Sequence, residues 1–200
     1  MRYRSLTVQT SPAVEPVTLS EAKAHCRVDT SDDDTYISTL ITAARQWVEQ
    51  YLDRSLVHQQ YVMRLDSFPY EIELPRPPMA TAGTTTAVAV TYTLGDESTA
   101  TLSATQYRVD RNSTPGVVRQ LRSGTWPGNL DDQNAVTVTW WAGYGASGTS
   151  VPAAIRHAIL MLVGHWYDGS RSAVLSGTIS KEVEFGVKSL LDSQRWGAYR

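Results

Sequence analysis

Three consecutive aspartates, Asp32, Asp33 and Asp34, open a stretch that reads DDDTYISTLITAARQWVEQYLDRSL. Clustered carboxylates either bind a divalent cation or cap the start of a helix. A calcium loop of the EF-hand type needs alternating oxygen ligands, a central glycine and a glutamate at its twelfth position, but residues 32–56 contain no glycine. An amphipathic pattern follows the aspartates directly, and helix N-termini favour carboxylates. The sequence therefore favours helix capping over a metal site.

Two histidines are the next candidates for metal ligation. His157 and His165 are eight residues apart, and Asp168 follows the second. Zinc enzymes of the HExxH type need histidines four residues apart with a glutamate beside the first. We therefore expect His157 to lie on the surface and His165 to be packed or to cap a helix. The single cysteine, Cys26, excludes an internal disulfide and is expected to be a small buried residue on a helix.

Sequence motifs for nucleophilic or phosphate chemistry are absent. The chain contains no G-x-S-x-G, no G-x-x-x-x-G-K-[ST] and no G-x-G-x-x-G motif. The glycine-rich stretch 143–148 is a weak candidate for a phosphate cradle and a better one for a hinge. Glu71 and Glu73 alternate with Ile72 and Leu74, which is typical of a solvated sheet face. We therefore predict no enzymatic activity, no cofactor and no catalytic or metal-binding residue.

Helices are predicted near both ends of the chain. Thr18 and Glu21 form the S/T-x-x-E pattern of a capping box, and apolar residues recur at steps of three and four in the later segments. On the second helix, Arg45, Glu49 and Gln50 fall on faces away from the apolar stripe. The predicted helices span residues 18–28, 33–52, 152–167 and 186–196. None of them can bury an apolar face alone, so we expect one bundle.

The middle of the chain has the pattern of β-structure. Residues 57–144 contain about six segments that alternate or are rich in β-branched residues, separated by turn signals such as PRPP and WPGN. Trp140 and Trp141 are adjacent on one segment, so one is expected to face inward and the other outward as a contact candidate. Residues 168–185 read as a long polar loop.

These elements predict an α+β fold. The N- and C-terminal segments are expected to form a helical bundle with a small antiparallel β domain inserted between them. The predicted parts are residues 1–56, the first part of the bundle; residues 57–147, the inserted domain; and residues 148–200, the second part of the bundle with a tail.

Composition restricts the function further. The 200 residues are 42% hydrophobic and 19% charged, with a formal net charge of −2, which is typical of an ordinary globular protein. No stretch reaches the roughly 20 apolar residues of a membrane span, and the N-terminus does not have the pattern of a secretory signal. The sequence has no basic block, although a protein that grips DNA by its phosphates needs one. Tight autonomous DNA binding is therefore not expected, whereas passing close to DNA is allowed.

Several stretches resemble a known family in their order and in their pattern of apolar and charged residues. They are PVTLSEAKAHCRVD, the acidic spacer TSDDD, the helix TYISTLITAARQWVEQYLDRSL, the later VPAAIRHAILMLVGHWYDGSR and the closing VEFGVKSLLDSQR. Together they resemble the head-tail connector (adaptor) proteins of tailed bacteriophages, of which gene transfer agents carry relatives. The resemblance covers about residues 14–56 and 150–195, and a β insertion is typical of the longer members.

The resemblance implies a structural virion protein that docks as a ring beneath the portal after DNA packaging. Such a ring extends the DNA channel and links the head to a head-closure or tail-side protein. It also implies a homo-oligomer, dodecameric on the portal and monomeric in isolation, that is made in the host cytoplasm and acts at the head-tail junction. DNA is expected to pass through the lumen without tight specific binding, and no membrane partner is expected.

Two other roles in the same particle stay open, a head-closure or tail-terminator component and a small DNA-packaging factor. Head-closure and tail-terminator proteins are usually dominated by a β-barrel, and the helical termini argue against them. A packaging factor has to bind DNA, which a salt-dependent gel shift would detect. An enzyme is the third alternative.

The resemblance places portal contacts of the family in terminal and loop segments rather than in a fixed motif. We therefore predict that the C-terminal tail docks on the portal and that the loop 168–185 contacts a neighbouring subunit or a tail-side partner. A frayed tail and a solvated loop are the alternatives. The predicted partner-binding residues are Arg195, Trp196, Tyr199 and Arg200 in the tail and Arg171 in the loop.

Overall fold

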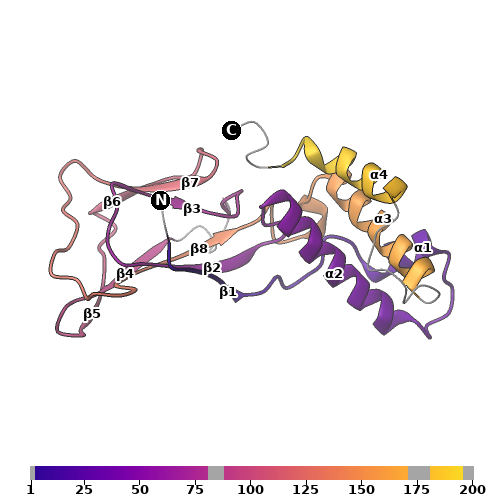
Figure 1. The fold of residues 1–200 in the computed structure, drawn as a ribbon, viewed down its shortest axis with the longest axis horizontal. Coiled ribbons are helices and arrows are strands. Elements are labelled where there is room, and N and C mark those ends of the chain that lie inside the picture. Colours follow the sequence, from indigo (N-terminus) through magenta and orange to yellow (C-terminus); the bar gives the residue numbers. More distant parts are fainter. Residues whose placement is uncertain (1–2, 81–87, 171–180, 196–200) are drawn as a thin grey trace. The chain divides into compact units, whose positions relative to one another are not determined.

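The chain forms two compact units in a computed structural model that describes residues 3–80, 88–170 and 181–195 (Figure 1). The first, which we call the β unit, comprises Met1–Ala13 and His58–Tyr144. The second, the helical unit, comprises Val14–Val57 and Gly145–Arg200. The observed elements, four α-helices and two antiparallel sheets, confirm the predicted α+β class.

The N-terminal boundary of the two units differs from the predicted one. The prediction assigned residues 1–56 to the helical part, but Ser5–Thr10 form strand β1 of the β unit. This strand pairs with β2 (Gln59–Leu65), and Ser5 lies opposite Arg64. Because a strand is defined by its hydrogen-bond partner and this partner lies far along the chain, the local pattern alone does not identify it.

The β unit contains two antiparallel sheets. One has five strands in the order β1-β2-β8-β4-β5, and the other has three in the order β3-β7-β6. The six predicted segments are present, and the short strands β1 and β5 were not predicted. After β1, the strands are β2 Gln59–Leu65, β3 Glu71–Leu74, β4 Ala89–Thr93, β5 Thr99–Thr101, β6 Tyr107–Asp110, β7 Gly116–Gln120 and β8 Val136–Ala142.

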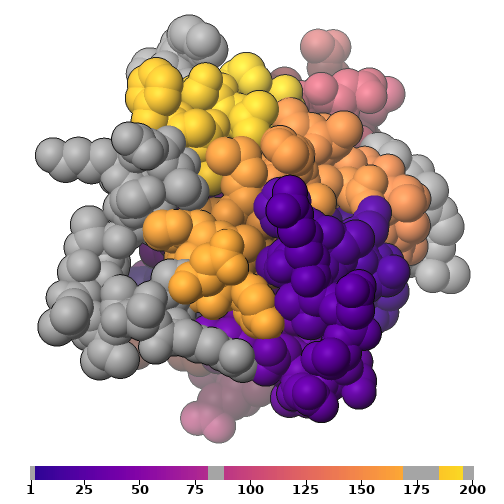
Figure 2. All heavy atoms as spheres, turned by 90° about the vertical axis from the view of Figure 1, so that its right-hand side faces the viewer, coloured from indigo at the N-terminus to yellow at the C-terminus, as the bar shows by residue number. Residues whose placement is uncertain are grey.

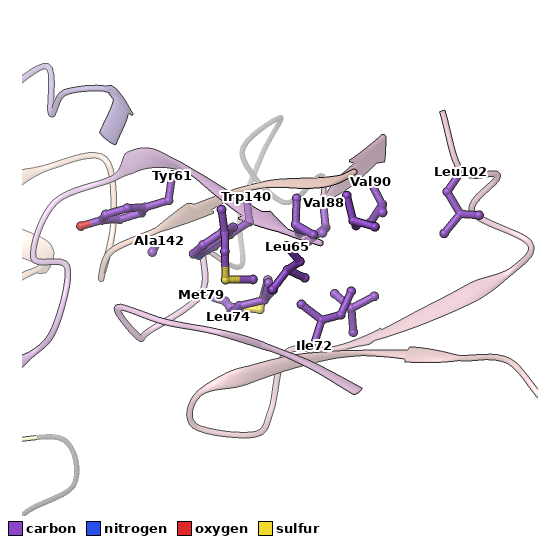
Figure 3. Close-up of a cluster of buried hydrophobic side chains, with 14 residues drawn as sticks. Tyr61, Leu65, Ile72, Leu74, Met79, Val88, Val90, Leu102, Trp140 and Ala142 are labelled. Atoms are coloured by element: carbon purple, nitrogen blue, oxygen red, sulfur yellow. The ribbon is translucent and has the colours of Figure 1, made fainter. Parts of the chain in front are cut away.

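Both sheets contribute side chains to one apolar core (Figure 3). Ile72 and Leu74 come from the smaller sheet, and Trp140 of β8 comes from the larger one, where its ring stacks on Tyr61 with centroids 5.7 Å apart. Trp140 is 0% exposed, whereas the adjacent Trp141 is half-buried. The prediction that one tryptophan faces inward and the other outward is therefore confirmed.

The helical unit is built around α3. Its helices are α1 Leu19–Cys26, α2 Asp34–Leu52, α3 Ala153–Ser170 and α4 Lys181–Asp192, with a 3₁₀ turn at Gly148–Ser150. Helix α3 packs against each of the other three. Figure 2 shows α3 (orange) between α4 (yellow) and the segment that contains α1 and α2 (indigo). The α3 side chains that are 0% exposed are Ile155, Ala158, Ile159, Leu162 and Val163.

The ends of the first two helices have clear local causes. Thr18 and Glu21 form the predicted capping box, in which the Glu21 N–H donates to Thr18 Oγ1 at 3.2 Å and the Thr18 N–H donates to Glu21 Oε2 at 2.8 Å. Arg27 and Asp53 end the two helices with left-handed backbone, at φ 57° and 53°. Each makes the backbone bonds of a Schellman-type cap, so both helices stop within two residues of the predicted ends.

The predicted polar loop 168–185 is wrong at both ends. Helix α3 continues to Ser170, and α4 begins at Lys181, whereas the prediction started the last helix at residue 186. The sequence KEVEFGVKSLLD has apolar residues at steps of three and four, as a helix requires. The charged residues at its start led to the prediction of a loop there. Residues 171–180 lie outside the described residues. Among the described helices, none combines the length and hydropathy that a membrane span requires.

Replacing Trp140 by alanine should destabilise the β unit much more than the same change at Trp141. Removing a fully buried tryptophan loses its transfer free energy and leaves a cavity, which costs about 3–5 kcal/mol. Trp141 is half-buried on the opposite face of the same strand, so its loss should cost less than half as much. Urea unfolding of the two variants followed by circular dichroism measures both values. Equal losses would contradict the observed orientation of the strand.

Candidate functional site

Two of the three aspartates, Asp33 and Asp34, bind neighbouring helices through their side chains. Asp33 is the residue before α2, and its side chain makes no capping hydrogen bond. Instead, the Tyr167 hydroxyl of α3 donates to Asp33 Oδ2 at 2.7 Å, and Lys23 Nζ of α1 donates to Asp34 Oδ1 at 2.6 Å. The predicted side-chain cap is therefore wrong at Asp33, because its carboxylate is directed to α3. Asp34 keeps the favourable position in the first helical turn.

The histidines do not form a metal site in the part of the chain that the structure describes. His157 is exposed, as predicted, and its ring lies edge-on to that of His25 at 6.4 Å. His165 is half-buried and lines an open cleft of about 730 Å³ between α1 and α3, together with Cys26 and Asp168. No group of three or more histidine, cysteine or acidic side chains among these residues is arranged to hold a metal ion.

Cys26 lacks the surroundings of a reactive thiol. Its side chain is half-buried rather than fully buried as predicted. Burial and then the Asp168 carboxylate raise the pKa of the Cys26 thiol. A thiol with a raised pKa forms less of the nucleophilic thiolate. The cleft therefore offers no activated cysteine.

The other candidate groups have structural surroundings. Glu71 accepts a hydrogen bond from Arg119 Nε at 2.8 Å across the β3–β7 pair, on the face opposite the buried Ile72. In the glycine-rich stretch 143–148, Gly143 has φ 130°, a backbone conformation that favours glycine. The boundary between the two units falls within this stretch, after Tyr144. The hinge stays a prediction.

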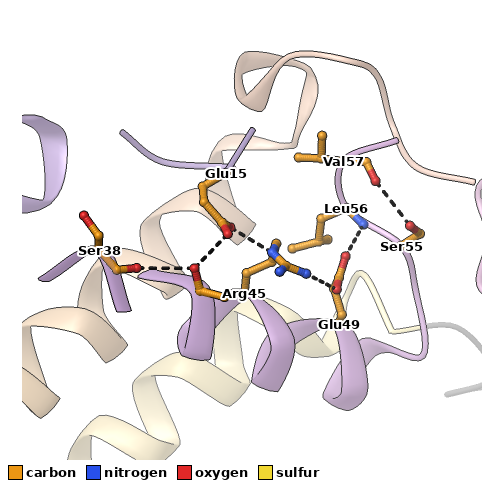
Figure 4. A network of polar contacts seen from close by, with 8 residues as sticks. Glu15, Ser38, Arg45, Glu49, Ser55, Leu56 and Val57 are labelled. Atoms are coloured by element: carbon orange, nitrogen blue, oxygen red, sulfur yellow. Dashed lines mark hydrogen bonds and ion pairs between the residues drawn. The ribbon is translucent and has the colours of Figure 1, made fainter. Parts of the chain in front are cut away.

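A buried ionic network lies along α2 (Figure 4). Arg45 Nε donates to Glu15 Oε2 at 2.8 Å, and Arg45 Nη1 donates to Glu49 Oε2 at 2.8 Å. The Leu56 N–H donates to the second Glu49 oxygen at 3.0 Å. The side chains of Arg45 and Glu49 are only 8% and 11% exposed. The sequence placed both residues off the apolar stripe, but the segment around Glu15 covers that face of the helix.

Glu49 and Glu21, two of the three described glutamates of the helical unit that bind arginine, have opposite electrostatic surroundings. Burial raises the pKa of Glu49, although the Leu56 N–H and Arg45 act in the other direction. The Thr18 N–H holds the pKa of Glu21 below its usual value, and Arg156 contributes to the same shift. Glu49 is therefore a carboxylate that burial penalises, whereas Glu21 is one that hydrogen bonds stabilise.

A polar and aromatic cluster joins the ends of α2 and α4, and we call it the C-terminal anchor. Trp47 and Tyr51 stack with ring centroids 5.4 Å apart and an interplanar angle of 4°. The Tyr51 hydroxyl donates to Asp192 Oδ1 at 2.6 Å, and Arg54 Nε donates to the Gln194 carbonyl at 2.6 Å. The residues of the C-terminal anchor are Trp47, Tyr51, Arg54, Asp192, Gln194 and Arg195.

Arg195 is the one predicted partner-binding residue within the described residues. It is exposed, and its guanidinium carbon lies 5.3 Å from the centre of the Tyr51 ring, within the range of a cation–π contact. The C-terminal anchor therefore fixes the position from which the tail continues. The other predicted residues, Trp196, Tyr199, Arg200 and Arg171, lie outside the described residues.

Two aromatic residues of the C-terminal anchor were not predicted from the sequence as binding residues. Trp47 and Tyr51 are four residues apart on a helix, and such pairs lie on one face. That spacing was available in the sequence as a signal for an aromatic surface patch. Tryptophan, tyrosine and arginine are also the residues that most often dominate binding energy at protein interfaces. The C-terminal anchor is therefore the candidate interface of the helical unit.

Comparisons with known proteins identify a family. A family model described as phage gp6-like head-tail connector protein matches residues 16–122, which is 107 of the 200 residues. No curated protein matches the chain. The matched residues run from the start of the helical unit, just before α1, into the β unit beyond β7.

Three similar solved chains come from gene transfer agent (GTA) particles. The first belongs to "Neck of empty GTA particle computed with C6 symmetry", with TM-score 0.75 and 20% identity, covering 96% of this chain and 95% of that one. The second belongs to "Virion of native gene transfer agent (GTA) particle", with TM-score 0.72, 18% identity and coverages of 95% and 94%. The third belongs to "Neck of native GTA particle computed with C12 symmetry", with TM-score 0.70, 19% identity and 94% of each chain. Similarity at this identity shows a shared fold over nearly the whole chain.

The two glutamates should affect stability with opposite dependence on pH. The folded state raises the Glu49 pKa above its usual 4.5, so it binds a proton more tightly than the unfolded chain and loses stability as pH rises through that window. The folded state lowers the Glu21 pKa below 4.5, so its contribution is present above that pH and is lost as pH falls.

Urea unfolding from about pH 3 to pH 7 tests this on Glu49→Gln and Glu21→Gln. As pH rises, the unfolding free energy of the natural chain should fall relative to Glu49→Gln and rise relative to Glu21→Gln. Each variant is the control for the other, since both remove one carboxylate that contacts an arginine in the helical unit. The same sign of slope in both comparisons would contradict the assigned surroundings.

Two substitutions at Tyr51 should separate the contacts of the C-terminal anchor. Tyr51→Phe removes the hydrogen bond to Asp192 and should cost about 0.5–1.5 kcal/mol. Tyr51→Leu also removes the stacking on Trp47 and the contact with Arg195, which should cost about 1 kcal/mol more. Urea unfolding measures both changes. If leucine costs no more than phenylalanine, the aromatic contacts contribute nothing to the anchor.

Proposed function

Because the chain belongs to the phage gp6-like head-tail connector protein family, we propose that it is one subunit of a ring at the head-tail junction of a virion. The ring docks beneath the portal after DNA packaging, extends the DNA channel and links the head to tail-side proteins. The family match over more than half of the chain carries this proposal. The fold shared with chains of GTA necks, over 94% or more of this chain, supports it.

The ring itself is supported by the symmetry of the particles in which similar chains occur. Those necks were computed with C6 and C12 symmetry, so a dodecamer on the portal is the proposed stoichiometry. A ring of identical subunits uses heterologous contacts, in which two different surfaces of each subunit meet. The proposed loop contact at Arg171 is one candidate for such a surface, and a tail-side partner is the alternative for it. Free subunits are proposed to stay monomeric.

The charge of the chain suits a channel through which DNA moves. The formal net charge is −2, and proteins that hold DNA tightly neutralise its phosphates with clustered lysine and arginine. A weakly acidic subunit offers few positive charges to the phosphates of DNA that moves through the channel. The chain is therefore proposed to form a conduit wall and not to package DNA itself.

Portal docking is assigned to the C-terminal tail. Arg195 is held on Tyr51 in the C-terminal anchor, and Trp196, Tyr199 and Arg200 follow it in the sequence. Aromatic and arginine side chains of this kind are enriched among the residues that dominate binding energy. The anchor would hold the start of the tail, so less conformational entropy would be lost when the tail binds.

Sedimentation velocity at physiological salt tests the proposal, with the chain alone and with the portal protein encoded by the same genome. The mixture should give a new, faster species with about one copy of the chain per portal subunit, as ring symmetry requires. Two independent components would argue against portal docking. A gel shift with DNA whose strength falls with salt would instead favour the packaging-factor alternative.

A chain that ends at Arg195 tests the assignment of the tail. It lacks Trp196, Tyr199 and Arg200 and keeps the C-terminal anchor, so it should fold normally and bind the portal at least about tenfold more weakly. The matched control is Tyr70→Ser, which removes an aromatic side chain that is 89% exposed on the β unit and should leave binding unchanged. Equal binding by the shortened and full-length chains would show that docking uses another surface.

A further inference from the structure

The chain passes between the two units at three places, after Ala13, after Val57 and after Tyr144. On the side of the helical unit, the adjoining residues are 14–17, 53–57 and 145–151, and we call them the crossing segments. All three belong to the helical unit. Their attachments within that unit converge on Arg45.

The first crossing segment is bound to the middle of α2. Glu15 accepts hydrogen bonds from Arg45 Nε at 2.8 Å and from the Thr42 hydroxyl at 2.9 Å. The carbonyl of Pro16 accepts a further bond from Arg156 Nε of α3 at 2.9 Å. The Glu15 side chain is 30% exposed, so this contact is largely removed from solvent.

The second crossing segment is bound to the same arginine through Glu49. Arg45 Nη1 donates to one Glu49 oxygen, and the Leu56 N–H donates to the other at 3.0 Å (Figure 4). The fully buried Ser55 hydroxyl also donates to the Val57 carbonyl at 3.4 Å. One guanidinium thus connects two segments that are about 40 residues apart in the sequence.

The third crossing segment contacts the other two. Val57 and Gly145 form a parallel β-bridge. At Gly148, an added Cβ atom would lie 2.5 Å from the Glu15 carbonyl oxygen, so the absence of a side chain allows this backbone to lie directly on the first segment. The position of residues 145–151 therefore depends on where Glu15 is held.

We propose that the Glu15–Arg45–Glu49 network is a clamp that holds the three crossing segments in one arrangement, independently of the apolar packing that holds the helices together. The buried side chains of α3 supply that packing, and they include none of the clamp residues. Opening the clamp should therefore loosen the crossing segments while the helices stay packed. This inference goes beyond the proposed function, because it concerns the isolated chain and needs no partner.

Hydrogen exchange of the full-length chain tests the clamp. The amides of Leu56, Ser150 and Val151 make hydrogen bonds within or from the crossing segments and report on their opening. In Arg45→Met, which removes the shared cation at similar side-chain volume, these amides should exchange at least about tenfold faster. The amides of α3 from Ile155 to Val163 should change less than about threefold.

A triple variant keeps the test decisive where Arg45→Met destabilises the whole helical unit. Losing the cation leaves the buried Glu49 carboxylate and the partly exposed Glu15 carboxylate without a counter-ion, which is destabilising. The variant Glu15→Gln, Arg45→Met, Glu49→Gln removes these charges and keeps an acceptor for the Leu56 N–H. Its unfolding midpoint should return close to that of the natural chain, while Ser150 and Val151 still exchange at least about tenfold faster.

The control is Lys23→Met, which breaks another cation–carboxylate contact of the helical unit, with Asp34 on α2. It should leave exchange at Leu56, Ser150 and Val151 unchanged. The clamp is overturned if the triple variant recovers both its stability and the natural exchange rates at Ser150 and Val151. It is also overturned if Lys23→Met accelerates these amides as much as Arg45→Met does.

Discussion

The burial of one apolar stripe on α3 is the interaction on which the helical unit depends. Five side chains from Ile155 to Val163 have no exposed surface, and removing each from water stabilises the fold by up to about 3 kcal/mol. Helix α3 packs against α1, α2 and α4, so the same stripe joins segments on both sides of the β unit in the sequence. A helical bundle whose parts are separated by about 90 residues can form only if this packing offsets the entropy of closing so long a loop.

A long insertion creates a second requirement. The crossing segments must leave the helical unit at defined places. Apolar packing is non-directional, whereas ion pairs and backbone hydrogen bonds fix geometry. The helical unit uses both, with apolar contacts along α3 and a buried cation between two carboxylates beside the crossing segments. Burying charge is expensive, and the raised pKa of Glu49 shows part of that cost.

Periodic patterns in the sequence predicted most of the fold, and features set by distant partners were missed. Helix α2 and strand β8 were identified because their apolar residues repeat along the element itself. Strand β1 was missed because its partner begins more than 50 residues later. Arg45 and Glu49 were placed on polar faces of α2, as helical spacing suggests, but the segment carrying Glu15 covers them. Of the candidate interface, Arg195 was predicted, whereas its contact with Tyr51 depends on how α4 packs.

The surroundings of the charged groups fit a protein that works by assembly. Several titratable side chains singled out by the sequence are bound to other parts of the fold, as Asp33 is to Tyr167 and Asp34 to Lys23. Hydrogen-bonded and paired in this way, they position helices. A subunit of the proposed ring has to present surfaces at fixed places to its neighbours, and binding is stronger when less has to be ordered on contact. Polar contacts that fix where a chain segment leaves a bundle, such as those of the C-terminal anchor, supply this preorganisation.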